Sequence, residues 1–162
     1  LILDAGPCTV GLESTVIDLT STPPCILRPG AVTFEQLEKI LPNLFYPHNP
    51  SPIAPGMKYR HYAPKAILIL VESPSPLEGE GRVRGYNVEK LIKEYTEQNK
   101  KIAVLDLREE KNLSDVARTL FAQLRAFDAQ GVDVIIVYVV QEAGLGAAIM
   151  NRLRKAATRI IT

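Results

Sequence analysis

The sequence is poor in the features that define several protein classes. Its 162 residues include only two cysteines, Cys8 and Cys25, which are too few for a cysteine-based metal framework and too far apart for a redox pair. We expect both to be buried thiols in a reducing compartment. Apolar runs are about seven residues long, whereas a membrane-spanning helix needs roughly 20. The sequence thus predicts no transmembrane segment and no membrane partner.

The sequence also has no large excess of positive or negative charge. The chain carries 19 basic and 18 acidic residues, a formal net charge of +1, so no global field draws it to nucleic acid or to an anionic membrane. Any such contact must be local. The chain begins with Leu1-Ile2-Leu3-Asp4, which reads as the middle of a strand and has no initiating methionine. This start predicts a fragment whose site continues upstream.

The first part of the chain predicts a short region that contains two strands and one helix. Residues Thr15 to Leu19 read TVIDL, which is typical of a strand, and a second short strand is predicted from Cys25 to Leu27. Thr33 with Gln36 three residues later forms a capping-box pattern. It predicts a helix that continues to Leu41, where the following proline stops it.

After residue 65 the pattern changes to apolar strands that alternate with amphipathic helices. We expect strands at 66–71, 102–107 and 132–140, and helices at about 88–95, 113–130 and 145–157. Three such units in tandem predict an α/β fold with helices on both faces of a parallel sheet. The predicted fold class is therefore a partial α+β segment followed by a small three-layer parallel-sheet domain of the Rossmann-like type.

Residues 46–65 form a proline-rich connector between these two regions. Four prolines lie between residues 50 and 64, too many for a helix or a central strand. The same segment contains an unbroken run of cationic and ring side chains, from Lys58 to Tyr62. It is either a stiff spacer or a segment that contacts a ligand. The run 73–85 is a low-complexity loop to which we assign no function.

Two polar positions in the first 30 residues are candidates for ligand binding. In Gly11 to Val16 a glycine bend precedes the hydroxyls of Ser14 and Thr15 at the start of a strand, where they can bind a carboxylate or a phosphate. Arg28 lies at a strand end before a Pro-Gly turn, which suits bidentate binding of phosphate. From the residues alone, two alternatives remain open. Ser14 and Thr15 could lie in a simple loop-to-strand junction, and Arg28 could be an ordinary surface arginine.

Four stretches carry a resemblance to a known family. GLESTVIDL, ILRPGAVTFEQLEKIL, PGMKYRHYAPKA and GLGAAIMNRLRKAA, in this order, resemble the C-terminal part of the two-domain threonylcarbamoyl-AMP synthases. The resemblance implies that residues 1–45 end a YrdC-like catalytic domain, that 46–65 form a linker that folds over the nucleotide as a lid, and that 66–162 form an accessory α/β domain.

The resemblance also implies a cytoplasmic enzyme, whose activity is the condensation of L-threonine, bicarbonate and ATP into threonylcarbamoyl-AMP and pyrophosphate for tRNA modification. It assigns threonine binding to Ser14 and Thr15, and it implies Mg²⁺ held mainly by phosphates and water. It assigns ATP binding to Arg28, Tyr59, Arg60, His61 and Tyr62. No catalytic residue is identifiable, because the KxR and SxN motifs that line the cleft of the family are expected upstream of Leu1, so this chain alone should be inactive.

Two further expectations accompany this assignment. Basic and acidic residues balance through Lys65, five of each, so we expect at most weak binding of tRNA by this chain. A different class of function stays open as well. The α/β domain could be a non-catalytic regulatory or partner-binding module, or the chain could derive from a degenerate or split gene.

Overall fold

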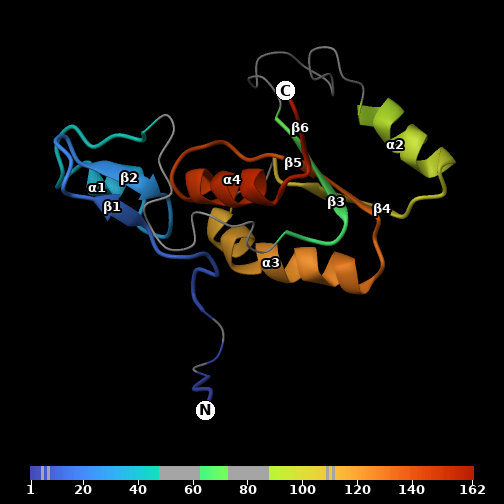
Figure 1. Ribbon diagram of the computed structural model, residues 1–162, viewed down its shortest axis with the longest axis horizontal. Coiled ribbons are helices and arrows are strands. Elements are labelled where there is room, and N and C mark those ends of the chain that lie inside the picture. The colour runs from blue at the N-terminus through green and yellow to red at the C-terminus, as the bar shows by residue number, and fades with distance from the viewer. Residues whose placement is uncertain (5, 7, 48–62, 73–87, 109, 111) are drawn as a thin grey trace.

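A computed structural model of the chain describes residues 1–4, 6, 8–47, 63–72, 88–108, 110 and 112–162. Figure 1 shows two regions side by side, a small one built from the first 47 residues and a larger one built around a four-stranded sheet. We call residues 11–47 the N-terminal unit and the described residues from 63 onward the α/β unit. The described residues before residue 11 extend away from both.

The N-terminal unit is a two-stranded antiparallel sheet with one short helix. Strand β1 (Val16–Asp18) pairs with β2 (Cys25–Arg28), and helix α1 (Phe34–Leu37) follows. Both strands were predicted, because β-branched and apolar residues favour a half-buried pleated surface. Three buried side chains form the core of the unit: Ile26, Leu37 and Leu44.

Helix α1 is shorter than the sequence indicates. Its start is as predicted, since the Thr33 N–H donates to Gln36 Oε1 over 2.9 Å. The prediction that the helix continues to Leu41 is wrong. After Leu37 the chain tightens into a turn in which the Ile40 N–H donates to the Leu37 carbonyl, three residues back. The last carbonyls of a helix have no partner within it, and such tighter bonds commonly close its final turn.

The α/β unit contains a parallel sheet in the order β4-β5-β3-β6. Its strands and helices are β3 (Ile67–Val71), α2 (Val88–Glu97), β4 (Ile102–Asp106), α3 (Leu113–Ala129), β5 (Val134–Tyr138), α4 (Leu145–Ala156) and β6 (Arg159–Ile161). The three predicted strands and three predicted helices are confirmed within a few residues. Strand β6 was not predicted.

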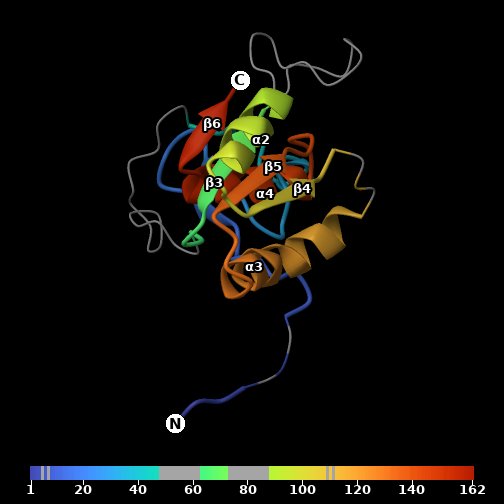
Figure 2. The same ribbon diagram turned by 90° about the vertical axis from the view of Figure 1, so that its right-hand side faces the viewer.

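The helices cover both faces of this sheet, which confirms the three-layer prediction. Helix α2 packs on one face, against Ile69, Val134 and Ile136. Helices α3 and α4 pack on the other face, against Leu68 and Ile135. Figure 2 views the molecule from the side of α2 and shows this helix in front of the strands, with α4 behind them and α3 below. Central strands with both faces covered are apolar at nearly every position, and β5 is buried from Val134 to Val137.

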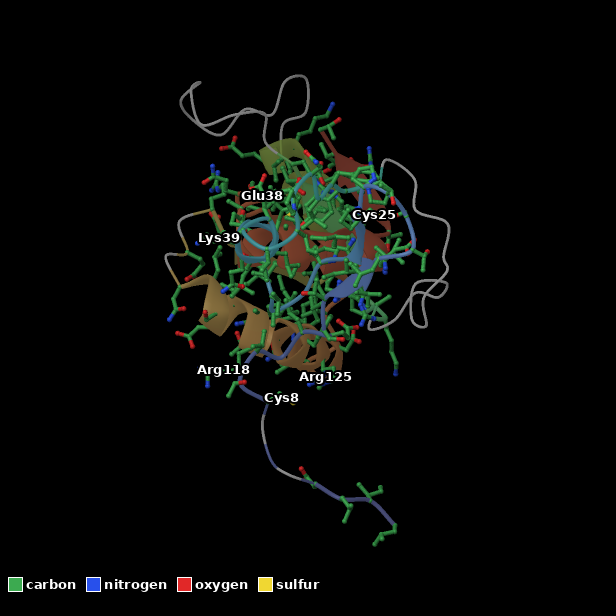
Figure 3. All side chains as sticks on the ribbon, turned by 90° about the vertical axis from the view of Figure 1, so that its left-hand side faces the viewer. Cys8, Cys25, Glu38, Lys39, Arg118 and Arg125 are labelled. Carbon is green, nitrogen blue, oxygen red and sulfur yellow. The ribbon has the colours of Figure 1, made fainter. Side chains whose placement is uncertain are left out.

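The two cysteines differ in their surroundings. Both are free thiols, but only Cys25 is buried. The expectation that Cys8 is buried is wrong, because this residue belongs to the segment that leaves the body of the molecule beneath α3 (Figure 3). Within the described ranges, no helix has the length and apolarity to cross a bilayer.

The N-terminal unit touches the α/β unit at two helices. At α3 the backbone of Gly11 lies so close that an added Cβ would come within 2.6 Å of Arg118 Cα, and Leu12 packs against the adjacent core. At the start of α4, the Gly144 N–H donates to Glu35 Oε1 over 3.0 Å. Figure 1 shows α4 between the N-terminal unit and the sheet.

Candidate functional site

Ser14 and Arg28, both singled out from the sequence, are in direct contact. Arg28 donates from Nε to the backbone carbonyl of Ser14 over 3.1 Å and from Nη2 to Ser14 Oγ over 3.3 Å. Ser14 is exposed and Arg28 is half-buried. Two hydrogen bonds to one residue hold the planar guanidinium in a defined orientation. A hydroxyl and a cation therefore lie together at one surface of the N-terminal unit.

An irregularity in the small sheet brings these two side chains together. The register shifts between Val16 and Ile17, so that Val16 faces Arg28 and Leu27 is an extra residue on β2. Cross-strand partners share a face of the sheet, and so do residues two apart along one strand. Arg28 therefore lies on the face that carries Ser14. A regular register would place Arg28 opposite the residue before Val16, on the other face.

The neighbouring turn packs directly on this strand. A Cβ added to Gly30 would lie 2.3 Å from the backbone nitrogen of Thr15 and 2.5 Å from the carbonyl oxygen of Glu13, so only glycine fits there. The Thr15 hydroxyl donates to the Val32 carbonyl over 2.6 Å. In this structure the Thr15 hydroxyl thus joins two loops, whereas the Ser14 hydroxyl meets Arg28.

The predicted linker contribution cannot be placed relative to this pair. The residues concerned, Tyr59, Arg60, His61 and Tyr62, lie outside the described residues. The predicted lid role of residues 46–65 falls largely on the same segment and stays a prediction.

A buried arginine from α4 supports the loops that carry the pair. Arg152 is 5% exposed and donates from Nε to Glu13 Oε2 over 2.5 Å and from Nη2 to the Pro29 carbonyl over 3.2 Å. Its Nη1 donates to Asn151 Oδ1 over 2.8 Å. Glu13 precedes Ser14 in the chain and Pro29 follows Arg28. One guanidinium of the α/β unit thus binds beside both candidate residues.

Burial, hydrogen bonds and neighbouring charges shift two pKa values in this cluster. Burial acts to raise the pKa of Glu13, but the hydrogen bond from Arg152, a backbone hydrogen bond and the charges of Arg152 and Arg28 outweigh it, so this pKa is lowered. The pKa of Lys155 is also lowered, first by burial and then by the charges of Arg152 and Arg28. Arg28, Arg152 and Lys155 thus each interact electrostatically with one carboxylate, and their excess of positive charge favours an additional anion.

Sequence reasoning did not single out Glu13, Arg152 or Lys155. One signal for Arg152 was present, because it falls between Ile149 and Leu153 on the apolar side of a predicted amphipathic helix. A charge at such a position needs a buried partner. Nothing local identifies that partner, since Glu13 lies 139 residues away in the chain.

The described part of the chain offers no cluster of metal ligands. Among the described residues, no three His, Cys, Asp or Glu side chains form a group that could hold a metal ion. These residues therefore do not offer a ligand set for the Mg²⁺ that the family resemblance implies.

Comparison with known proteins identifies relatives over nearly the whole chain. A family model described as "Threonylcarbamoyl-AMP synthase, C-terminal domain" matches residues 32–158. The chain is 45% identical to the threonylcarbamoyl-AMP synthase of Pyrococcus abyssi over 170 residues, which is 96% of this chain and 48% of that protein. It is 37% identical to the enzyme of the same name from Bacillus subtilis, again over 96% of this chain and 48% of the relative.

Solved structures agree with these matches. A crystal structure of P. abyssi Sua5 complexed with L-threonine superposes with a TM-score of 0.80 at 42% identity, covering 98% of this chain and 49% of that one. A P. abyssi Sua5 variant, in which a histidine and the tyrosine after it are replaced by alanine, gives a TM-score of 0.78 at 41% identity over 94% of this chain and 47% of that one. The chain spans about half the length of the curated relatives it matches.

Proposed function

Because the chain belongs to the family of threonylcarbamoyl-AMP synthase C-terminal domains, we propose that the full-length protein condenses L-threonine, bicarbonate and ATP into threonylcarbamoyl-AMP and pyrophosphate, and that this chain contributes part of the site. We further propose that it acts in the cytoplasm and that its product supplies the threonylcarbamoyl group of a modified tRNA adenosine. The observation that carries the proposal is the 3.3 Å contact between Arg28 Nη2 and Ser14 Oγ.

This contact suits the chemistry of the reaction. The threonine amine combines with bicarbonate to give an N-carboxylate and water. An oxygen of that carboxylate then attacks the α-phosphorus of ATP, and the bond to the β-phosphate breaks to release pyrophosphate. Both the carboxylate and the triphosphate are anions that must lie next to each other. A fixed guanidinium lowers their mutual repulsion and stabilises the charge that develops on the phosphates without a proton transfer.

The roles divide between the two halves of the pair. We assign threonine binding to the Ser14 hydroxyl, with Thr15 holding the adjacent loop, and ATP binding to Arg28. Two hydrogen bonds already orient Arg28, and such preorganisation reduces the cost of ordering the site when substrate binds. Any Mg²⁺ would arrive with the ATP phosphates and water.

The linker completes the proposed site. We assign Tyr59, Arg60, His61 and Tyr62 to the nucleotide, with an aromatic side chain that excludes water from the labile carbamate. Their sequence supports this assignment, because His61-Tyr62 is the only histidine followed by tyrosine in the chain. A solved relative carries a paired replacement of the same two residue types.

The test is pyrophosphate release that depends on all three substrates, measured with the protein as its gene encodes it. Arg28→Gln should lower kcat/KM by roughly 10²-fold, the usual effect of removing one donor that stabilises transition-state charge. His61→Ala with Tyr62→Ala should lower turnover as well. Arg125→Gln, a change on α3 (Figure 3), is the matched control and should leave the rate unchanged.

One outcome would contradict the proposed reaction, and another would contradict only the role assigned to Arg28. Wild-type protein that releases no pyrophosphate would favour the alternative of a non-catalytic module, for which the family match over residues 32–158 leaves room. Wild-type activity that persists in Arg28→Gln would remove the assigned role of Arg28 but leave the reaction standing.

A further inference from the structure

We propose that Arg152 is a positioning residue through which the α/β unit holds the Ser14 and Arg28 loops in their productive arrangement. The inference gives the α/β unit a task in the reaction, and it rests on the proposed function only for what the two loops bind. Arg152 does not need to contact substrate, because it acts through the residues next to the pair.

The geometry of the three donors carries this inference. Nε and Nη2 of Arg152 reach two separate loops, at the Glu13 carboxylate and the Pro29 carbonyl. Nη1 is held by Asn151 on the same helix. The rigid fork of a guanidinium therefore fixes the distance between the two loops as well as their distance from α4. A lysine has a single ammonium and cannot hold three acceptors in one plane.

The ion pair between Arg152 and Glu13 is largely buried, and it joins α4 to the loops of the candidate site. The Arg152 side chain is 5% exposed and that of Glu13 is 29% exposed, so water screens their attraction less than it screens a surface pair. Arg154, two positions further along α4, provides the contrast. It pairs with Glu72 over 2.7 Å and with Glu142, both within the α/β unit. Two ion-paired arginines on one helix thus face different parts of the molecule.

The rest of the contact between the units supports a fixed placement. Gly11 lies against the backbone of α3, and Glu35 accepts the Gly144 N–H at the start of α4. These contacts hold the N-terminal unit at Gly11 and at α1, whereas Arg152 binds beside the candidate residues themselves. Loss of Arg152 should therefore loosen the site locally and leave the two units associated.

The first arm of the test measures amide hydrogen exchange in the absence of substrate, so it does not depend on the proposed reaction. In Arg152→Gln, peptides covering residues 11–18 and 25–32 should exchange about tenfold faster, as expected for loss of hydrogen bonds to a charged group. Arg154→Gln is the matched control. It should leave those peptides unchanged and affect only the α/β unit.

The second arm measures kinetics. Arg152→Gln should raise the KM for L-threonine about tenfold, and Arg152→Lys should give a smaller rise because it keeps the charge but loses the fork. A purely structural role would instead lower the amount of active protein, which reduces apparent kcat and leaves KM unchanged. If the wild type has no threonine-dependent activity, the proposed function fails while the exchange arm still decides the role of Arg152.

A substitution at Glu13, the less buried partner, keeps the proposal testable if Arg152→Gln fails to fold. Glu13→Gln removes the acceptor charge and leaves the α4 packing intact, and it should speed exchange in peptide 11–18 about threefold. The proposal is overturned if both Glu13→Gln and every folded Arg152 variant keep wild-type exchange and wild-type KM. It is equally overturned if Arg154→Gln changes the two peptides as much as Arg152→Gln does.

Discussion

The two units of the molecule achieve order in different ways. The α/β unit buries an apolar layer on each face of its sheet and carries its own core. The N-terminal unit has a core of only three buried side chains and leaves large apolar residues exposed, among them Leu19, Val32, Ile40 and Phe45. A small core contributes little stability. The comparison indicates that the unit with the candidate site depends on the other unit for its placement.

The largest expected effect is on the free energy of unfolding. It is tested with one alanine substitution in the core of each unit. Ile136→Ala, at a fully buried position of β5, should lower the free energy of unfolding of the α/β unit by about 2–5 kcal/mol. Ile26→Ala, equally buried in β2, should speed hydrogen exchange in residues 16–45 and leave the main denaturant transition in place. Ile160→Ala, at a 44% exposed position, serves as the control.

Urea unfolding followed by circular dichroism, together with hydrogen exchange, distinguishes these cases. If Ile26→Ala shifts the main transition as far as Ile136→Ala does, the two units unfold as one. The difference drawn between them would then be wrong.

An intermediate effect is expected at the contact with α3. Gly11 has φ +68°, and its added Cβ would meet the Arg118 backbone. Gly131 has φ +69° with open space around it. Alanine at either position must adopt a left-handed backbone conformation, which costs roughly 1–2 kcal/mol. Only Gly11→Ala should also push the units apart, which would appear as faster exchange in residues 8–18. Equal behaviour of the two variants would show that backbone conformation alone matters.

The smallest effect is a pH dependence at the start of α4. The hydrogen bond from the Gly144 N–H is the main cause that lowers the pKa of Glu35. The bond is therefore fully present above the ordinary pKa of 4.5 and is lost as the pH falls through the lowered value. The amide proton shift of Gly144, followed by NMR, should move in that acidic range. Glu35→Gln should abolish the movement, and Glu38→Gln should preserve it.

The sequence predicted the α/β unit well because its signals are local. Continuous apolar runs marked β3 to β5, and helical spacing marked α2 to α4. Strand β6 was not predicted because Arg159 and Ile160 are exposed and β3, the strand with which it pairs in the described part of the chain, lies some 90 residues earlier. Short edge strands of this kind owe their existence to pairing, which no local pattern records.

The candidate site was predictable only in part. Ser14 and Arg28 stood out as a hydroxyl and a cation at strand ends, but their contact requires a register shift that the sequence does not reveal. The pairing of Glu13 with Arg152 joins residues 139 positions apart. Contacts of that kind follow from how the two units dock, and docking depends on the complete shape of both surfaces.

The extra residue on β2 also determines which kinds of genetic change this segment tolerates. Many apolar side chains could replace Leu27, because its identity does not set the direction of its neighbours. Deleting it would restore an ordinary ladder and turn the Arg28 side chain to the opposite side of the sheet. In this part of the chain the number of residues matters more than their identity. A reading-frame-preserving loss of one codon should therefore do more harm than most missense changes at the same place.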